Sequence, residues 1–180
     1  MEESKILYQG KTLIYPTDTI WGIGCNALNI TAIDKIKQIK GRDKTKSFIL
    51  LIKNLQMLEK YVENVPAIAL RLINEIKTPL TIIYPKAKNL PIEHLSFNES
   101  IGIRIPKDDF LQHLFEEFPY PIVSTSANFS GKESPKCFAD IDKDLLNKVD
   151  YVSFFNRDKI NSSASSIYII DNDNNAKKIR

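Results

Sequence analysis

The sequence is poor in cysteine and histidine and contains no long apolar run. Its two cysteines, Cys25 and Cys137, are far apart and form no C-x-x-C pair, which predicts free thiols rather than a metal site. No apolar run approaches ~20 residues, so no membrane-spanning segment is expected. The N-terminal stretch has two early acids and no apolar signal core. We therefore expect a cytoplasmic protein with no membrane partner.

The sequence has only two histidines and a small net charge. His94 and His113 are not spaced as metal ligands, and His113 is expected at the surface or its boundary. A net charge of +3 permits an anionic ligand without requiring nucleic acid. The 180 residues, 43% hydrophobic and 26% charged, predict a single globular domain spanning residues 1–180.

Short apolar runs alternate with segments of helical periodicity through most of the chain. We expect helices near residues 30–40, 55–61, 66–76, 108–118 and 139–146. We expect strands near residues 12–15, 48–52, 80–84, 101–105, 121–123, 151–155 and 167–170, with a short one at the C-terminus. Residues 86–99 are polar and are expected to be irregular. This alternation predicts an α/β fold, in which helices pack against a mixed sheet.

The stretch from Val123 to Gly131, VSTSANFSG, concentrates small polar side chains directly after an apolar run. Hydroxyl-rich, glycine-closed loops after strands are suited to surrounding phosphate or carboxylate oxygens. The alternative is a Ser/Asn turn that satisfies its own backbone. From composition alone the two interpretations are about equally supported.

Two other segments contain cations that are candidates for binding an anion. Lys40-Gly41-Arg42 follows a helix that Asn29 or Thr31 would cap, and its cations either stabilise the helix C-terminus or clamp phosphates. In the strand 101–105, Arg104 faces away from the isoleucines and therefore needs a partner or a ligand anion.

The segment 16–24, PTDTIWGIG, has two threonines and an aspartate beside an expected exposed turn. Its glycines, Gly22 and Gly24, form only an incomplete dinucleotide-binding pattern. Trp21 is expected either in the core or as a pocket wall, with the core favoured.

Four motifs in this order resemble the YrdC family of threonylcarbamoyl-AMP synthases. They are Tyr15–Gly22 (YPTDTIWG), Lys40–Arg42 (KGR), Arg104–Pro106 (RIP) and Ser126–Gly131 (SANFSG). The resemblance covers nearly the whole chain and indicates the short, single-domain form. It implies a twisted mixed sheet with helices around an open, basic cavity.

The resemblance also implies a reaction and its partners. L-threonine, bicarbonate and ATP would give threonylcarbamoyl-AMP and pyrophosphate. The product would be used by threonylcarbamoyl transferase proteins to modify a tRNA adenosine next to the anticodon. Mg²⁺ would bridge the ATP phosphates. The alternatives are an RNA-binding module that recognises tRNA or structured RNA, and a transfer or interaction subunit that has lost synthesis.

Site residues follow from the match to the family pattern. The expected ATP-binding residues are Lys40, Arg42, Lys46, Ser100, Ser126, Asn128, Ser134 and Arg180. The expected threonine-binding residues are Thr17, Thr19, Arg104, Ser124 and Ser165. No nucleophile–base pair and no protein metal ligand are expected, so catalysis would rest on positioning and charge stabilisation.

The sequence departs from the family pattern at a few positions. Trp21 replaces the usual tyrosine, Leu51 stands where the family often has histidine, and Asp43 replaces a proline. Ser165-Ser166 replaces a serine–threonine pair. The loop 156–166 is our candidate for a segment that closes over the cavity.

Overall fold

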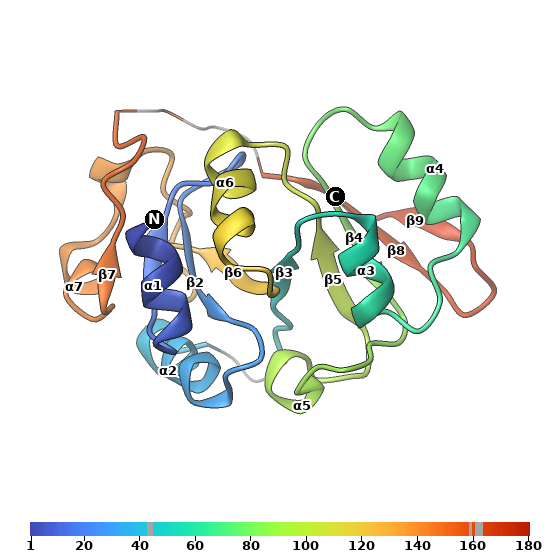
Figure 1. The fold of residues 1–180 in the computed structure, drawn as a ribbon, viewed down its shortest axis with the longest axis horizontal. Helices are drawn as coiled ribbons and strands as arrows, with labels where there is room; N and C mark the ends of the chain where they lie inside the picture. The colour runs from blue at the N-terminus through green and yellow to red at the C-terminus, as the bar shows by residue number, and fades with distance from the viewer. Residues whose placement is uncertain (43–44, 159, 161–163) are drawn as a thin grey trace.

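The computed structural model describes residues 1–42, 45–158, 160 and 164–180. Within these residues the strands form one nine-stranded sheet in the order β7-β1-β2-β6-β3-β5-β4-β8-β9 (Figure 1). The strands are β1 (Leu13–Tyr15), β2 (Gly22–Asn26), β3 (Ile49–Leu51), β4 (Leu80–Tyr84), β5 (Ile101–Arg104), β6 (Ile122–Ser126), β7 (Tyr151–Val152), β8 (Ser166–Ile170) and β9 (Ala176–Lys178). The helices are α1 (Glu2–Tyr8), α2 (Ile30–Lys40), α3 (Leu55–Tyr61), α4 (Ala67–Glu75), α5 (Ile92–Leu95), α6 (Asp109–Glu117) and α7 (Lys143–Leu146), with a 3₁₀ turn at Phe138–Asp140.

The sheet is mixed, as predicted. Strands β1 and β7, β3 and β5, and β4 and β8 pair in parallel. The remaining neighbours pair antiparallel. The predicted α/β fold is therefore confirmed.

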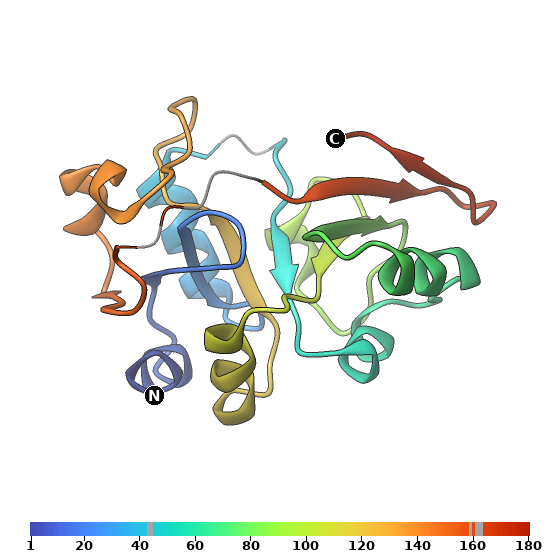
Figure 2. The same ribbon diagram turned by 90° about the horizontal axis from the view of Figure 1, so that it is seen from above.

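The two faces of the sheet are covered differently. Helices α1, α3 and α6 lie on one face, in front of the strands in Figure 1 and below them in Figure 2. Neighbouring residues of strand β5 point to opposite faces of the sheet. Ile103 lines an apolar cavity on the side that carries the helices, and Arg104 lines a polar cavity on the other side. This confirms the predicted alternation in residues 101–105.

Helix α2 follows its local signals closely. Asn29 Oδ1 accepts a hydrogen bond from the backbone N–H of Ala32 at 3.0 Å, so the helix begins where an Asx cap was expected. Gly41 ends it with φ +56° in the left-handed region. The predicted stripe of Ile33, Ile36 and Ile39 is buried in the core.

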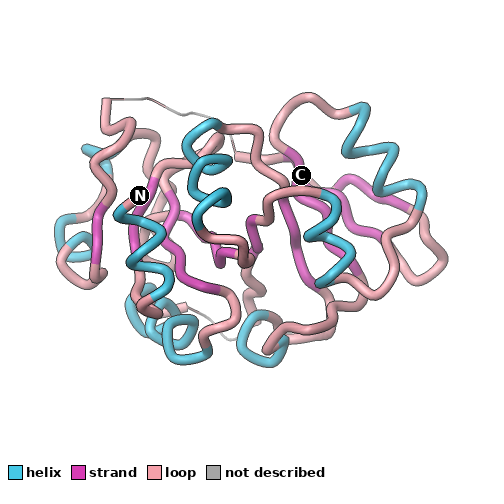
Figure 3. Tube along the Cα trace, viewed as in Figure 1, coloured by secondary structure: helices cyan, strands magenta, loops and turns pink. Residues whose placement is uncertain are grey.

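Other elements differ from the sequence expectation. Helix α1 and strand β2 were missed, because α1 is short and the two glycines of β2 indicated a turn. The region 139–146 contains a 3₁₀ turn and a separate helix, since Asp142 accepts a hydrogen bond from the N–H of Asp144 and starts a new turn. Figure 3 shows that residues 86–99 are mostly loop, as predicted, apart from the short helix α5.

Two further expectations concern the cysteines and membranes. Cys25 is buried, Cys137 is partly buried, and both are free thiols. Across the described residues, no helix combines the length and apolar character needed to cross a bilayer.

Candidate functional site

A polar cavity of about 220 Å³ is lined by Arg104 and therefore lies on the sheet face opposite α1, α3 and α6. Its described lining residues come from six separate parts of the chain. They are Thr17, Thr19, Ile20, Trp21, Gly22, Arg42, Ser47, Ile49, Arg104, Ser124, Thr125, Ser126, Ser134, Ala164, Ser165 and Arg180. Most of the residues predicted from the motifs therefore line one cavity.

The cavity carries an excess of positive charge. Arg42, Arg104 and Arg180 line it, and no aspartate or glutamate is among its described lining residues. Burial lowers the pKa of Arg180, and the nearby charge of Arg104 lowers it further. Arginines held close together in a partly buried space favour an anionic ligand that neutralises them.

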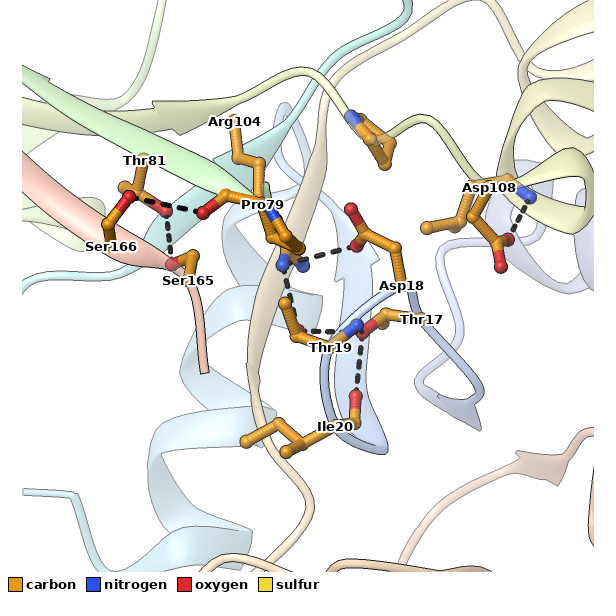
Figure 4. A network of polar contacts seen from close by, with 12 residues as sticks. Thr17, Asp18, Thr19, Ile20, Pro79, Thr81, Arg104, Asp108, Ser165 and Ser166 are labelled. Carbon is orange, nitrogen blue, oxygen red and sulfur yellow. Dashed lines mark hydrogen bonds and ion pairs between the residues drawn. The ribbon is translucent and has the colours of Figure 1, made fainter. Parts of the chain in front are cut away.

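Arg104 lies at the deep end of this cavity and is only 6% exposed. Its Nη1 donates to Thr19 Oγ1 at 2.7 Å and lies 3.2 Å from Asp18 Oδ1 (Figure 4). The sequence left open whether Arg104 has a partner or awaits a ligand anion, and the structure supplies a partner in Asp18. Its Nε makes no hydrogen bond within the described part of the chain, so donor capacity remains for a ligand.

The loop between β1 and β2 presents the two threonines. The Thr17 hydroxyl accepts from the N–H of Thr19 at 3.0 Å and donates to the carbonyl of Ile20 at 2.7 Å, which fixes the turn (Figure 4). Thr17 and Thr19 are 2% and 5% exposed, so the expectation of an exposed turn was wrong. The turn is buried, and Arg104 packs against it through Thr19 and Asp18.

Ser165 and Arg180 form the opposite wall. Ser165 Oγ lies 2.8 Å from Thr81 Oγ1, across the parallel pair of β4 and β8 (Figure 4). Arg180 Nε donates to the Ser165 carbonyl at 3.0 Å, and its backbone pairs with Ile167. Residues far apart in sequence are thus joined through the β8–β9 hairpin.

Strand β6 forms the floor of the cavity. Ser124, Thr125 and Ser126 belong to this strand rather than to the loop in which they were expected, and the loop begins at Ala127. Register with β2 places Gly22 opposite Ser126 and Gly24 opposite Ser124. A Cβ at Gly24 would meet the Val123 carbonyl oxygen at 2.2 Å, so the close approach of these strands requires glycine there.

Arg42 is held in place at the rim. Its Nη1 donates to Thr125 Oγ1 at 3.2 Å and its Nη2 donates to the Ser47 carbonyl at 2.5 Å. The guanidinium also lies over the ring of Phe48, 4.5 Å from the centroid. Burial lowers the pKa of Arg42 below its ordinary value. These contacts orient the planar fork before any ligand binds.

Lys40 does not line the cavity. Its side chain is 3% exposed, and its ammonium donates to the backbone carbonyls of Ser126 and Asn128. The N–H of Ser130 in turn donates to the Lys40 carbonyl at 2.9 Å. Burial lowers the pKa of Lys40 to about 7, and the charges of Arg42 and Lys46 add to the effect. Lys40 therefore joins the end of α2 to the turn after β6.

Three other predicted ATP residues also lie outside this cavity. Lys46 is exposed and lines a neighbouring hollow beside Arg42. The amide of Asn128 donates to the carbonyls of Phe129 and Lys132, which closes the turn. Ser100 donates to Asn98 Oδ1 at 2.6 Å. Ser100 is linked to the cavity only through hydrogen bonds that run from Asn98 to Ser96 and from Ser96 to Ser47, which lines the cavity.

The structure also shows where two positions that depart from the family pattern lie. Leu51 is fully buried, between Arg104 of β5 and Ile122 of β6 in register. Trp21 is 1% exposed, packs on Phe138 at 5.1 Å between centroids and also lines the cavity, so both interpretations of it are correct. Asp43, Lys44 and part of the loop 156–166 lie outside the described residues, so the loop's proposed closure stays a prediction.

Sequence reasoning missed Asp18 and Thr81 as parts of the site. Asp18 had a signal, because it stands between the two predicted threonines and an arginine needed a partner. Thr81 had none, since its contact with Ser165 depends on strand order. Among the described residues, no group of three or more histidine, cysteine or acidic side chains is placed to hold a metal ion.

The fold and the cavity define a class of α/β protein with an arginine-rich site on the open face of a mixed sheet. The Sua5/YciO/YrdC family model, described as telomere recombination, matches residues 5–180. The chain belongs to this family. It is 38% identical to a putative threonylcarbamoyl-AMP synthase of Methanocaldococcus jannaschii over 93% of this chain and 78% of the relative.

Solved structures agree with this placement. The crystal structure of E. coli YciO superposes with a TM-score of 0.85 at 25% identity, over 99% of this chain and 86% of the YciO chain. Pyrococcus abyssi Sua5 in complex with L-threonine superposes with a TM-score of 0.82 at 26% identity. That alignment covers 94% of this chain and 50% of the Sua5 chain, so the present chain spans about half of that relative.

Proposed function

We propose that the chain is a threonylcarbamoyl-AMP synthase, which converts L-threonine, bicarbonate and ATP into threonylcarbamoyl-AMP, pyrophosphate and water. The observation that carries the proposal is the cavity itself, in which three arginines and several hydroxyls converge and the described lining residues include no carboxylate. Relatives bearing this activity in their names, among them the M. jannaschii protein, support it.

The deep end of the cavity fits an amino acid with a hydroxyl group. The Arg104 guanidinium would bind the threonine carboxylate, since its Nε is buried and makes no hydrogen bond to any residue that the structure describes. The hydroxyls of Thr19, Ser124 and Ser165 would face the ligand's polar atoms. A site built from buried hydroxyls discriminates against ligands that leave those groups unpaired. The solved complex of Sua5 with L-threonine supports this assignment.

The rim of the cavity fits the phosphates of ATP. Arg42 is pre-oriented by Thr125 and Ser47, and Arg180 approaches from the opposite wall. Ser126 and Ser134 lie between them in the lining. We keep Lys46 as an ATP residue at the outer edge. Lys40, Asn128 and Ser100 would contribute indirectly, by holding the segments that carry Ser126 and Ser47.

The chemistry needs no side-chain nucleophile. The threonine amine and bicarbonate form a carbamate with loss of water, a carbamate oxygen attacks the α-phosphorus, and pyrophosphate leaves. The arginines would stabilise the charge that develops on the phosphoryl oxygens, and the cavity would hold the carbamate in line. Mg²⁺, if used, would be bound mainly by the ATP phosphates, because the described residues offer no acidic cluster for it.

Pyrophosphate release tests the proposal. Release from ATP in bicarbonate buffer should require L-threonine and be weaker with serine. Arg104→Gln should raise the KM for threonine by about tenfold or more, because a charged hydrogen bond is lost. Arg71→Gln, at an exposed arginine on α4, is the matched control. Pyrophosphate formed equally well without threonine would contradict the assignment.

The RNA-binding alternative, with tRNA or structured RNA as partner, depended on a basic cluster around Lys40–Lys46. The structure weakens that argument, because the Lys40 ammonium is buried against two carbonyls and contributes no surface charge. A strongly salt-dependent affinity for tRNA that ATP does not change would favour the alternative. Transfer of the product to threonylcarbamoyl transferase partners remains part of the proposal.

A further inference from the structure

A second cavity lies on the opposite face of the sheet, between the sheet and helices α3 and α4. Its volume is about 150 Å³. Most of its lining is aliphatic or aromatic, namely Leu58, Ile73, Ile76, Leu80, Ile82, Tyr84, Ile103 and Ile105. A cavity of ~150 Å³ with such walls is large enough for a group the size of benzene.

The polar groups of this cavity gather at one end. Strands β4 and β5 are antiparallel, with Ile82 opposite Ile103. The first residues of β4 therefore lie beside the last residues of β5. Lys77 and Thr78 precede β4, and Lys107 follows β5. The cavity therefore has an apolar interior and a charged end.

Each charged group at that end retains hydrogen-bonding capacity. Lys77 Nζ donates to the carbonyl of Asn74 at 2.6 Å, and Lys107 Nζ lies 3.5 Å from the carbonyl of Ile76. An ammonium has three donors, so each lysine can also bind an anionic group. Asp18 Oδ1 is buried beside Arg104, but the Asp18 side chain as a whole is 14% exposed and lines the cavity, so its carboxylate can face a ligand there.

We propose that this cavity binds a free α-amino acid with a branched apolar side chain, of the leucine or isoleucine type. The side chain would fill the apolar interior between α4 and β4. The carboxylate would bind Lys77 and Lys107, and the α-ammonium would pair with the Asp18 carboxylate, which borders the cavity. A purely apolar molecule would leave the charged end unused, and a purely anionic one would face the Asp18 carboxylate.

Asp18 connects this cavity to the arginine-rich one. It lines the apolar cavity, and its Oδ1 lies 3.2 Å from Nη1 of Arg104, which lines the other (Figure 4). An ammonium at Asp18 would neutralise the partner of Arg104 and leave its guanidinium more positive toward a carboxylate. Binding on one face would therefore strengthen threonine binding on the other, and the coupling would be reciprocal. Only this coupling depends on the proposed function.

Calorimetric titration with leucine tests the site, with two analogues that each lack one charge. Isovalerate lacks the ammonium and isopentylamine lacks the carboxylate. We expect leucine to bind at least tenfold more tightly than either. Equal binding of isovalerate and leucine would refute the role of Asp18, and no leucine binding at all would refute the site.

The competing explanation is that leucine enters the arginine-rich cavity, and threonine distinguishes the two. Our proposal requires saturating threonine to leave leucine affinity unchanged or to raise it, by about fivefold or more if the faces are coupled. Displacement of leucine by threonine would refute it. A protein that binds leucine but releases no pyrophosphate would refute the synthase proposal alone.

Two substitutions locate the ligand. Ile73→Trp on α4 would fill the cavity, and Asp18→Asn would remove the charge while keeping the side-chain size. Both should weaken leucine binding at least tenfold. Glu75→Gln, an exposed position on the same helix, is the control and should leave it unchanged. Cross-peaks between leucine methyls and Ile103 in a methyl NMR spectrum would locate the ligand without any substitution, and their absence in a leucine-bound sample would refute the location.

Discussion

The buried ammonium of Lys40 gives the sharpest stability prediction. In the folded protein its pKa is lowered from 10.5 to about 7 by burial, with further contributions from Arg42 and Lys46. In the unfolded chain the pKa returns to about 10.4. Between pH 7 and 9 the unfolded chain therefore binds more protons at this position than the folded protein does. The contribution of Lys40 to the free energy of unfolding must rise with pH across that window.

The size of this rise in the free energy of unfolding follows from the same two pKa values. Integrating the proton difference from pH 7 to 9 gives about 2 kcal/mol, because the group is half-protonated at pH 7 and nearly neutral at pH 9. The neutral amine still has two N–H donors, enough for the carbonyls of Ser126 and Asn128. Deprotonation therefore removes the buried charge without breaking the contact between α2 and the turn.

The assay compares wild type with Lys40→Met by urea unfolding at pH 7, 8 and 9. Trp21 is the only tryptophan and is 1% exposed, so its fluorescence reports unfolding. All other titrating groups are shared and cancel in the difference. We expect the wild type to gain about 2 kcal/mol relative to the variant between pH 7 and 9. Lys11→Met, at an exposed lysine, should show no such trend, and parallel curves for Lys40→Met would refute the lowered pKa.

Other substitutions test the site and the sheet separately. Arg42→Lys should raise the KM for ATP by roughly tenfold to a hundredfold and the KM for threonine by less, because a lysine cannot reproduce the planar guanidinium held by Thr125 and Ser47. Initial rates at varied ATP concentration measure this. Gly24→Ala should lower the free energy of unfolding by about 1–3 kcal/mol or prevent folding, since its Cβ would meet the Val123 carbonyl, whereas Gly41→Ala, with open space around it, should cost only about 1–2 kcal/mol. Leu51→His should also lower urea stability by roughly 1–3 kcal/mol, because it places a polar ring at a fully buried position.

Local signals allowed several elements to be predicted from the sequence. Helix α2 could be bounded from Asn29 and Gly41, because a cap and a left-handed terminator act within one turn of chain. The alternation of residues 101–105 separated Arg104 from Ile103, since a strand has a period of two. The ordered motifs indicated the family, and the match over residues 5–180 confirms that identification.

Elements without a strong local signal could not be predicted. Strand β2 contains Gly22 and Gly24, which favour turns, and it exists because β1 and β6 pair on either side of it. Ser124 and Ser126 were expected in a loop, yet they extend β6 for the same reason. Pairing with distant strands outweighed local propensity in both cases.

The sequence by itself determined the fold class, the ends of α2 and the set of polar residues available for an anion. Only the tertiary structure decided which of them share a cavity. It brought Ser165 and Arg180 to Arg104 by adding β8 and β9 beside β4, and it turned the Lys40 ammonium toward two carbonyls. The physical reason is that strand order and side-chain burial depend on contacts between segments far apart in the chain, which local propensity and periodicity do not encode.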